Sequence, residues 1–262
     1  MLGLGSNISK TGKLGVHDLG IVTSNLVLKH NYDLSSVQLV SDGAASFVSS
    51  GNDYITMGDQ SSLSFSTGSF SVSCWVNLHQ TGTTTNFVVS KKAGASIDDV
   101  GYALYLGNAG TDWIFSASDG TNYAAPATAV NQNANQWYHL CGTFDGVAKT
   151  AKLYVDGVKV SVITDTNIED IDTTQPFEIG KTGADVSYDT SGYVCNVGVW
   201  NDVLSQAQVK SIMWKKYSDL ISSETARLVS WWNLDEETDT NGTVGGTGGV
   251  KDHKGSNHGT LL

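Results

Sequence analysis

The carboxylate and histidine side chains of this 262-residue chain are poorly spaced for catalysis. Hydrolysis of a glycosidic bond, for example, needs two carboxyl groups that flank the bond. The chain has five Glu, and none forms an acidic pair at the alternating spacing that places both side chains on one strand face. Of the six His, only His253 and His258 are close together, and no Gly-x-Ser-x-Gly motif accompanies them. These residues predict a protein that is not an enzyme.

Calcium is the metal that the sequence favours, because its loops are rich in hard oxygen ligands. Asp outnumbers Glu by 21 to 5. Glu237, Asp239 and Asn241 alternate in the manner of a calcium-binding loop, although a suitably placed closing Glu is absent. The competing interpretation is that these acidic residues are solvated turn residues, whose side chains bond to nearby backbone groups.

Aromatic residues suggest a different kind of site, in which a sugar ring stacks on an exposed side chain. Trp113 and Tyr123 are the best candidates for ligand binding, since they lie on either side of the turn sequence at residues 119–122. Exposed aromatic residues can equally mark contacts with other proteins. The tryptophans within apolar strand-like runs are predicted to belong to the core instead: Trp75, Trp137 and Trp200.

The composition excludes several other classes of protein. Twenty-six acidic residues against 15 basic ones give a net charge of −11, and no cluster of Lys and Arg forms the patch that nucleic acid requires. No apolar stretch reaches the roughly 18 residues of a membrane-spanning helix. The first residues lack the basic flank and apolar run of a signal peptide, so we expect a soluble protein made in the cytoplasm. The three Cys lie in apolar runs, which predicts buried, reduced thiols.

Short β-rich runs separated by turn residues dominate the chain after Ala44, and one main domain is expected. Asp156-Gly157 predicts a tight hairpin, because these residues adopt the positive φ of a primed turn. One helix is predicted after Leu204, capped by Ser205 with Gln208 three residues later. Ten predicted strands indicate an all-β sandwich or jelly roll: Tyr54–Met57, Phe70–Val76, Asn86–Ser90, Tyr102–Leu106, Trp113–Ser116, Trp137–Phe144, Lys152–Val155, Lys159–Val162, Phe177–Gly180 and Tyr193–Trp200.

An ordered series of motifs resembles the laminin-G-like, concanavalin A-like jelly rolls. The resemblance covers about residues 43 to 262. It implies an all-β antiparallel β-sandwich jelly roll with one short helix at residues 41–262, preceded by an extended N-terminal arm at residues 1–40. The motifs that carry it are Asn52–Ile55, Phe70–Val76, Trp137–Gly146, Leu153–Gly157, Phe177–Gly180 and Gly192–Ser205.

Residues 228–262 resemble the strands that usually open such a domain, although here they close the chain. They can pair within the same chain, which we favour because chain ends commonly lie close together, or be swapped with a neighbouring subunit. The family layout would also bring a group of oxygen ligands towards one end of the sandwich, where they would hold calcium: Asp53, Asp235, Asp252 and Asn257.

Jelly rolls of this kind that lack catalytic carboxylates are mostly recognition or assembly modules, and the fold alone does not choose between the two. The Gly-containing arm followed by Thr23–Tyr32 resembles the laminin-G-like structural proteins of tailed bacteriophages. This resemblance implies a virion structural protein, a capsid decoration or fibre component, which forms homo-oligomers and contacts other virion proteins through residues 1–40. The alternative is a carbohydrate-binding or adhesion module that holds a glycan, with or without calcium.

Overall fold

The computed structural model describes residues 41, 43–48, 53–82, 84–107, 109–129, 132–183, 189–235 and 248–262. The chain divides into two units, residues 1–39 and 40–262, and all described residues belong to the second. The predicted arm at residues 1–40 therefore lies outside the described residues. Among the residues that are described, no helix combines the length and the apolar character needed to cross a membrane.

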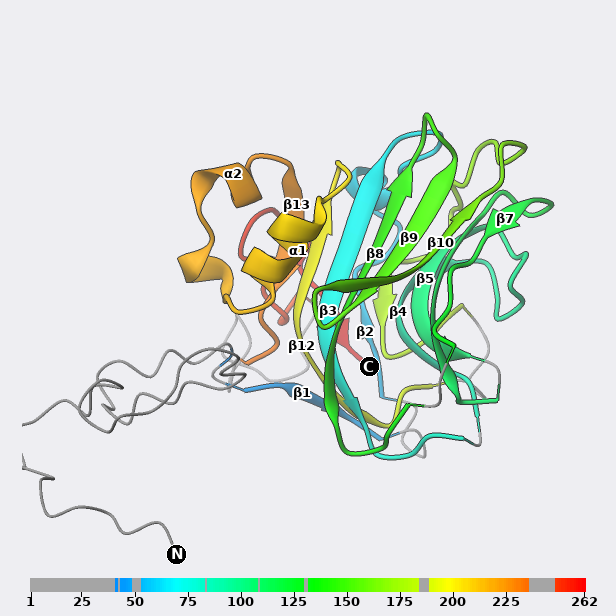
Figure 1. Cartoon of the computed structure of the whole chain (residues 1–262). Helices are drawn as coiled ribbons and strands as arrows, with labels where there is room; N and C mark the ends of the chain where they lie inside the picture. Colours follow the sequence, from blue (N-terminus) through cyan, green and yellow to red (C-terminus); the bar gives the residue numbers. More distant parts are fainter. Residues whose placement is uncertain are drawn as a thin grey trace, which may run out of the picture. The chain divides into compact units, whose positions relative to one another are not determined.

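Two antiparallel sheets form the described part of the chain as a sandwich (Figure 1). This arrangement confirms the predicted all-β fold. Sheet A contains, in spatial order, β1 (Ala45–Phe47), β12 (Gly192–Trp200), β3 (Phe70–Leu78), β8 (Trp137–Asp145), β9 (Thr150–Val155) and β10 (Val158–Thr164), and β13 (Leu228–Trp232) also pairs with β12. Sheet B contains β14 (Thr260–Leu261), β2 (Ile55–Thr56), β11 (Glu178–Ile179), β4 (Asn86–Lys92), β5 (Gly101–Gly107), β6 (Asp112–Ser118) and β7 (Tyr123–Ala124).

Side-chain alternation explains how β3 divides its residues between the core and the outer face of sheet A. Val72 and Val76 point towards sheet B and are fully buried, whereas Trp75 and Asn77 point the other way. Each fully buried Val contributes roughly 1.5–3 kcal/mol to stability. The outer face of sheet A is therefore available for other elements or for ligands.

The helices lie beside β12 and β13, outside the sandwich (Figure 1). α1 (Gln206–Ile212) begins at the predicted cap, because the Ser205 hydroxyl accepts the Gln208 N–H and the Gln208 side chain accepts the Ser205 N–H. The sequence did not predict the short α2 (Ser222–Thr225). Single 3₁₀ turns are found at η3 (Ser61–Leu63) and η5 (Tyr217–Asp219).

The predicted hairpin joins β9 and β10. Asp156 and Gly157 have φ values of 50° and 74°, as a primed turn requires. Asp156 also bonds back to β8, since its N–H donates to the His139 carbonyl at 2.8 Å and its carboxylate accepts the His139 N–H at 2.9 Å. The turn therefore fixes three strands in register.

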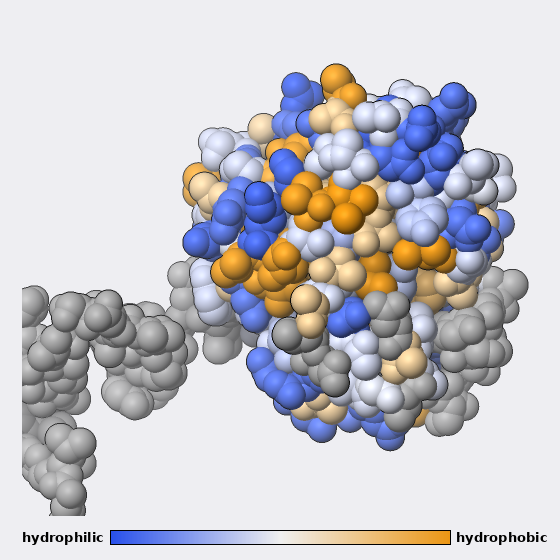
Figure 2. Space-filling model, turned by 45° about the vertical axis from the view of Figure 1, so that its right-hand side comes forward, coloured by the Kyte–Doolittle hydropathy of each residue, from blue (hydrophilic) through white to orange (hydrophobic). Residues whose placement is uncertain are grey.

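β10 is the last strand of sheet A on its side, and its apolar residues are exposed. Figure 2 shows hydrophobic residues in separate clusters among hydrophilic ones on the side of the molecule that is turned forward. Lys159 and the register shift between Lys159 and Ser161 are features that discourage a strand edge from pairing with another chain. The exposed apolar residues of β10 are Val158, Val160, Val162 and Ile163.

Residues 228–262 supply strands to both sheets. β13 pairs with β12, and β14 pairs with β2. All three Cys are buried free thiols, as predicted. Burial raises the pKa of the Cys195 thiol to about 12.

Candidate binding site

The two aromatic residues that the sequence proposes for ligand binding differ in their exposure. Trp113 lies in β6 with only 1% of its surface exposed, and its ring packs edge-on against Tyr138 at 5.7 Å between centroids. Strand alternation points Trp113 inwards together with Phe115, so it offers no stacking face to a ligand. This corrects the expectation for Trp113. Tyr123, at the start of β7, is 41% exposed.

The loop that precedes Tyr123 in the sequence lines a polar pocket, and the Asp119 carboxylate is the main hydrogen-bond acceptor there. The Asp119 carboxylate accepts the backbone N–H groups of Thr121, Asn122 and Glu169 at 2.7–2.8 Å. Burial opposes ionisation of Asp119, but these hydrogen bonds outweigh it and hold the pKa of the carboxyl below its ordinary value. Asp119 therefore joins two loops, which is a structural role.

Two of the four proposed calcium ligands, Asp252 and Asn257, do lie together. The buried Asp252 carboxylate accepts backbone N–H groups from Trp231 at 3.0 Å, Lys254 at 2.9 Å and Asn257 at 3.1 Å. The Asn257 amide donates to the Ser230 hydroxyl at 2.7 Å. These bonds attach the C-terminal segment to β13 and already occupy both oxygens of the Asp252 carboxylate.

The other two proposed ligands do not complete a calcium site. Asp53 accepts the Val48 N–H at 3.1 Å. Within the described residues, no three His, Cys, Asp or Glu side chains are grouped in a way that could hold a metal ion, so Asp53, Asp235 and Asp252 do not converge. The residues proposed for calcium therefore do not fit that ion. The alternating stretch from Glu237 to Asn241 lies outside the described residues.

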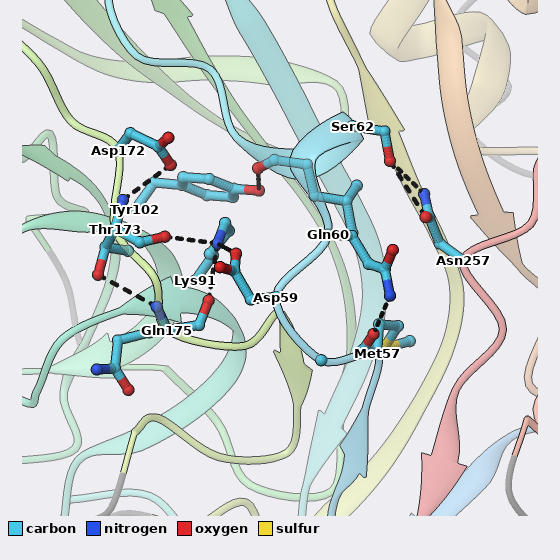
Figure 3. Close-up of polar contacts among 12 residues, drawn as sticks. Met57, Asp59, Gln60, Ser62, Lys91, Tyr102, Asp172, Thr173, Gln175 and Asn257 are labelled. Atoms are coloured by element: carbon cyan, nitrogen blue, oxygen red, sulfur yellow. Dashed lines mark hydrogen bonds and ion pairs between the residues drawn. The ribbon is translucent and has the colours of Figure 1, made fainter.

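An oxygen-rich cluster elsewhere is filled by a lysine side chain (Figure 3). The Nζ atom of the buried Lys91, on β4, lies 2.7 Å from each of three oxygens: Asp59 Oδ1, Thr173 O and Gln175 O. An ammonium group has three donors, so all of them are satisfied. A buried charge is tolerated only when it is paired and hydrogen-bonded, and this one ties two loops to sheet B.

Two further carboxyl groups, Glu178 and Asp189, are buried near sheet B. The pKa of Glu178 is raised to about 7, mainly because the carboxyl group is buried. A glycosidase needs carboxyl groups that reach a bound sugar on either side of the scissile bond. Glu178 and Asp189 are buried instead, so their carboxyl groups do not face a bound sugar.

The outer face of sheet A carries a row of three side chains that the sequence did not single out. Tyr193 on β12, Asn77 on β3 and Trp137 on β8 stand directly opposite one another across the strands. In the next row, Trp75 stands opposite His139. Trp137 and Tyr193 are 40% and 39% exposed, although both are large rings on a sheet surface.

The Trp137 and Tyr193 rings lean towards each other across the short side chain of Asn77. Their centroids are 6.4 Å apart, which is less than the roughly 9.5 Å between strands separated by one neighbour. The Asn77 amide oxygen is buried between the strands and has no hydrogen-bond partner within the described residues. A buried amide oxygen without a partner costs free energy unless a ligand or water bonds to it.

Trp75 forms a second ring pair with Trp214, which follows α1. The two centroids are 5.9 Å apart, and the Trp75 indole N–H donates to the Met213 carbonyl at 2.8 Å. This hydrogen bond fixes both the Trp75 ring and the end of the helix. On its other side, Trp75 contacts the buried His139 ring at 5.4 Å. Trp214 itself is 58% exposed.

These side chains line one open groove of about 660 Å³, which lies within the usual size range of ligand pockets. Ser41, Gly43 and Ala44 also contribute to its lining. No Asp, Glu, Lys, Arg or His belongs to the described residues that line it. We call it the aromatic groove and define it by Trp75, Asn77, Trp137, Tyr193, Cys195 and Trp214.

The sequence prediction that Trp75 and Trp137 belong to the core is wrong, whereas Trp200 is buried as predicted. The alternation within β3 contained the signal, because Trp75 is out of phase with Val72, Cys74 and Val76. No sequence pattern places Trp214 beside Trp75, since that contact depends on how α1 packs.

Comparisons with known proteins agree with this architecture. The sequence profile of the Concanavalin A-like lectin/glucanases superfamily (Laminin_G_3) matches residues 49–210, and the chain belongs to this family. A search of curated protein sequences finds no significant match.

The chain is similar in structure to a candidate carbohydrate-binding protein from Bacteroides ovatus ATCC 8483, with a TM-score of 0.64 and 18% identity. That likeness covers 87% of this chain and 59% of the other, so the chain spans little more than half of that structure. Domain 4 of the arabinanase AbnA from Geobacillus stearothermophilus, in complex with arabinotriose, has a TM-score of 0.47 and 21% identity, covering 58% of this chain and 69% of that one. The CBM40 of a Ruminococcus gnavus sialidase, bound to sialyllactose, has 0.45 and 18%, covering 56% and 83%.

Proposed function

We propose that this protein binds carbohydrate and that the aromatic groove is its binding site. The observation that carries the proposal is the convergence of four aromatic side chains on one open groove whose described lining residues are uncharged. Aromatic rings offer flat apolar faces with a partly negative surface, which suits the C–H faces of sugar rings. A few polar groups, such as the Asn77 amide, would fix the orientation of the sugar.

Family membership and the likeness to the Bacteroides ovatus protein support this proposal. At 18% identity that likeness concerns the fold, so the position of the site is argued from the residues of this chain. Carbohydrate binding, the alternative in the sequence analysis, thus becomes the main proposal.

We further propose that the protein binds its ligand without cleaving it. Glycoside hydrolysis needs two carboxyl groups at the scissile bond. None of the described residues in the aromatic groove carries one.

A glycan array with three forms of the protein tests the proposed function. We expect the wild type and the Tyr123→Ala control to bind the same glycans, and Trp214→Ala to lose that signal. Trp214 and Tyr123 are both exposed aromatic residues, but only Trp214 lines the groove. A folded wild-type protein that binds no glycan on the array would remove the proposal, and equal loss in both variants would remove the groove as its site.

The virion role, with residues 1–40 as the anchor to other virion proteins, stays a prediction from the sequence resemblance, as do virion location and homo-oligomer formation. Mass spectrometry of purified particles from the source virus would test it. A chain that is absent from such particles would end that interpretation, and the carbohydrate proposal would be unaffected.

A further inference from the structure

We infer that the ligand of the aromatic groove is a neutral oligosaccharide, at least two sugar rings long, which binds without a metal ion. This inference rests on the proposed function and narrows it to a class of glycan. Three properties of the groove carry it: the charge of its lining, its unpaired polar atoms and the spacing of its ring pairs.

The lining residues that the structure describes carry no charge. None of them is Asp, Glu, Lys, Arg or His, and the Cys195 thiol remains protonated because burial raises its pKa to about 12. The ring beneath Trp75 is also uncharged at neutral pH, because burial lowers the pKa of His139 to about 3. An anionic glycan would find no cationic partner in such a groove, and the net charge of −11 would repel it from the protein.

The described lining also lacks the carboxylate ligands that a calcium site uses. Among the described lining residues, the oxygens are those of an amide, of hydroxyl groups and of the backbone. Recognition through a bridging calcium ion is therefore not expected at this site.

The polar atoms of the groove match the chemistry of sugar hydroxyl groups, which both donate and accept hydrogen bonds. The buried Asn77 amide oxygen is an unpaired acceptor between the Trp137 and Tyr193 rings. The indole N–H groups of Trp137 and Trp214 are donors that have no protein partner within the described part of the chain. A purely apolar ligand would leave the Asn77 oxygen unpaired, whereas a sugar hydroxyl group can donate to it.

The two ring pairs are spaced for more than one sugar. Asn77 lies on β3 between Trp137 and Tyr193, which form the first ring pair. Trp75, which belongs to the second pair, is two residues away from Asn77 on the same strand. Two residues of a strand span about 7 Å, which is comparable to one pyranose ring. A single sugar can thus stack on one pair, whereas a disaccharide can contact both.

Isothermal titration calorimetry with matched glycans tests the inference. The probes are neutral hexose oligomers of increasing length, and sialylated, sulfated and uronic acid glycans of similar size, each titrated with EDTA and then with excess calcium. We expect a neutral disaccharide to bind at least about tenfold more tightly than its monosaccharide, a difference of about 1.4 kcal/mol. Acidic glycans should bind at least about tenfold more weakly, and EDTA should have no effect.

The possible failures are distinguishable. Equal or tighter binding of acidic glycans, loss of binding in EDTA, or equal affinity for monosaccharide and disaccharide would overturn the inference while leaving carbohydrate binding intact. Absence of binding to every glycan would instead remove the proposed function itself.

A charge-introducing pair of variants sharpens the test. Asn77→Asp places a carboxylate at the unpaired acceptor position, and Thr121→Asp adds the same charge in the loop near Asp119, outside the groove. We expect neutral glycan affinity to fall at least about tenfold in Asn77→Asp and to stay unchanged in Thr121→Asp. Should Asn77→Asp fail to fold, Tyr193→Lys at the exposed rim is the second variant, and it should shift the preference towards acidic glycans. A preference that does not move in either folded variant would contradict the inference.

Discussion

The two halves of the outer face of sheet A differ in what covers them. In one half, β3, β8 and β12 present small residues such as Ser73, Cys141 and Gly198, and side chains from α1 complete a second hydrophobic cluster above them. In the other half the same strands present Trp137 and Tyr193, which remain about two-fifths exposed.

Residue size accounts for the difference. A Cβ atom at Gly198 would lie 2.6 Å from the Trp200 ring and 2.8 Å from the Trp231 ring, so only Gly lets these rings pack there. The Trp200 indole N–H donates to the Glu224 carbonyl at 2.8 Å, which joins the covered half to α2. Packing thus explains every large ring in the covered half. It does not explain the exposed rings of the open half, which the proposed sugar ligand would cover.

The largest expected effect is on stability in the covered half. Trp200→Ala should lower the free energy of unfolding by about 3–5 kcal/mol, because it leaves a cavity in a closed cluster and removes the bond to Glu224. Urea denaturation measures this loss. Trp137→Ala makes the same chemical change in the open half and should cost about 1 kcal/mol or less. Equal losses in the two variants would show that both halves are packed alike.

The next effect is a pH dependence of stability that comes from His139. Burial lowers the pKa of His139 from 6.5 to about 3, so the unfolded chain binds a proton in this window and the folded protein does not. The free energy of unfolding should therefore fall by about 2 kcal/mol from this group between about pH 7 and about pH 4.5. Urea denaturation of the wild type and of His139→Gln at both pH values isolates the contribution. A pH difference that is the same in both proteins would contradict it.

A smaller effect is expected on affinity in the open half. Trp137→Ala should weaken glycan binding about tenfold, equivalent to about 1.4 kcal/mol, because it removes one stacking face. Calorimetry at neutral pH measures the change, and Val147→Ala, an exposed apolar residue in the β8–β9 turn, is the control. Unchanged affinity in Trp137→Ala would place the binding site elsewhere.

The smallest effect is expected from calcium. The Asp252 carboxylate already accepts backbone N–H groups, and no three carboxylate, His or Cys side chains of the described residues are grouped for a metal ion, so excess calcium should shift the melting temperature by no more than about 1 °C. Thermal unfolding followed by circular dichroism, with EDTA and then with calcium, gives the result. An increase of several degrees would restore a calcium site to this protein.

Local patterns predicted the scaffold well. The Asp156-Gly157 turn and the Ser205 cap both depend on neighbours in the sequence, and the structure has each of them.

The site was harder to predict because it depends on contacts between distant segments. Trp75 and Trp137 fit an apolar strand pattern, and only the position of α1 decides which half of the outer face is covered. The calcium prediction counted Asp252 and Asn257 as free ligands, whereas backbone N–H groups of the C-terminal segment use the carboxylate. The spacing of residues in the sequence does not reveal hydrogen bonds of this kind.

The indole N–H signals of the seven tryptophans test the central claim most directly. In a ¹H–¹⁵N correlation spectrum, titration with a neutral oligosaccharide should move the signals of Trp75, Trp137 and Trp214, which line the aromatic groove. The signals of the buried tryptophans should stay in place: Trp113, Trp200, Trp231 and Trp232. Shifts confined to the buried set, or a spectrum in which a bound sugar moves none of the three groove signals, would contradict the assignment of the groove as the carbohydrate site.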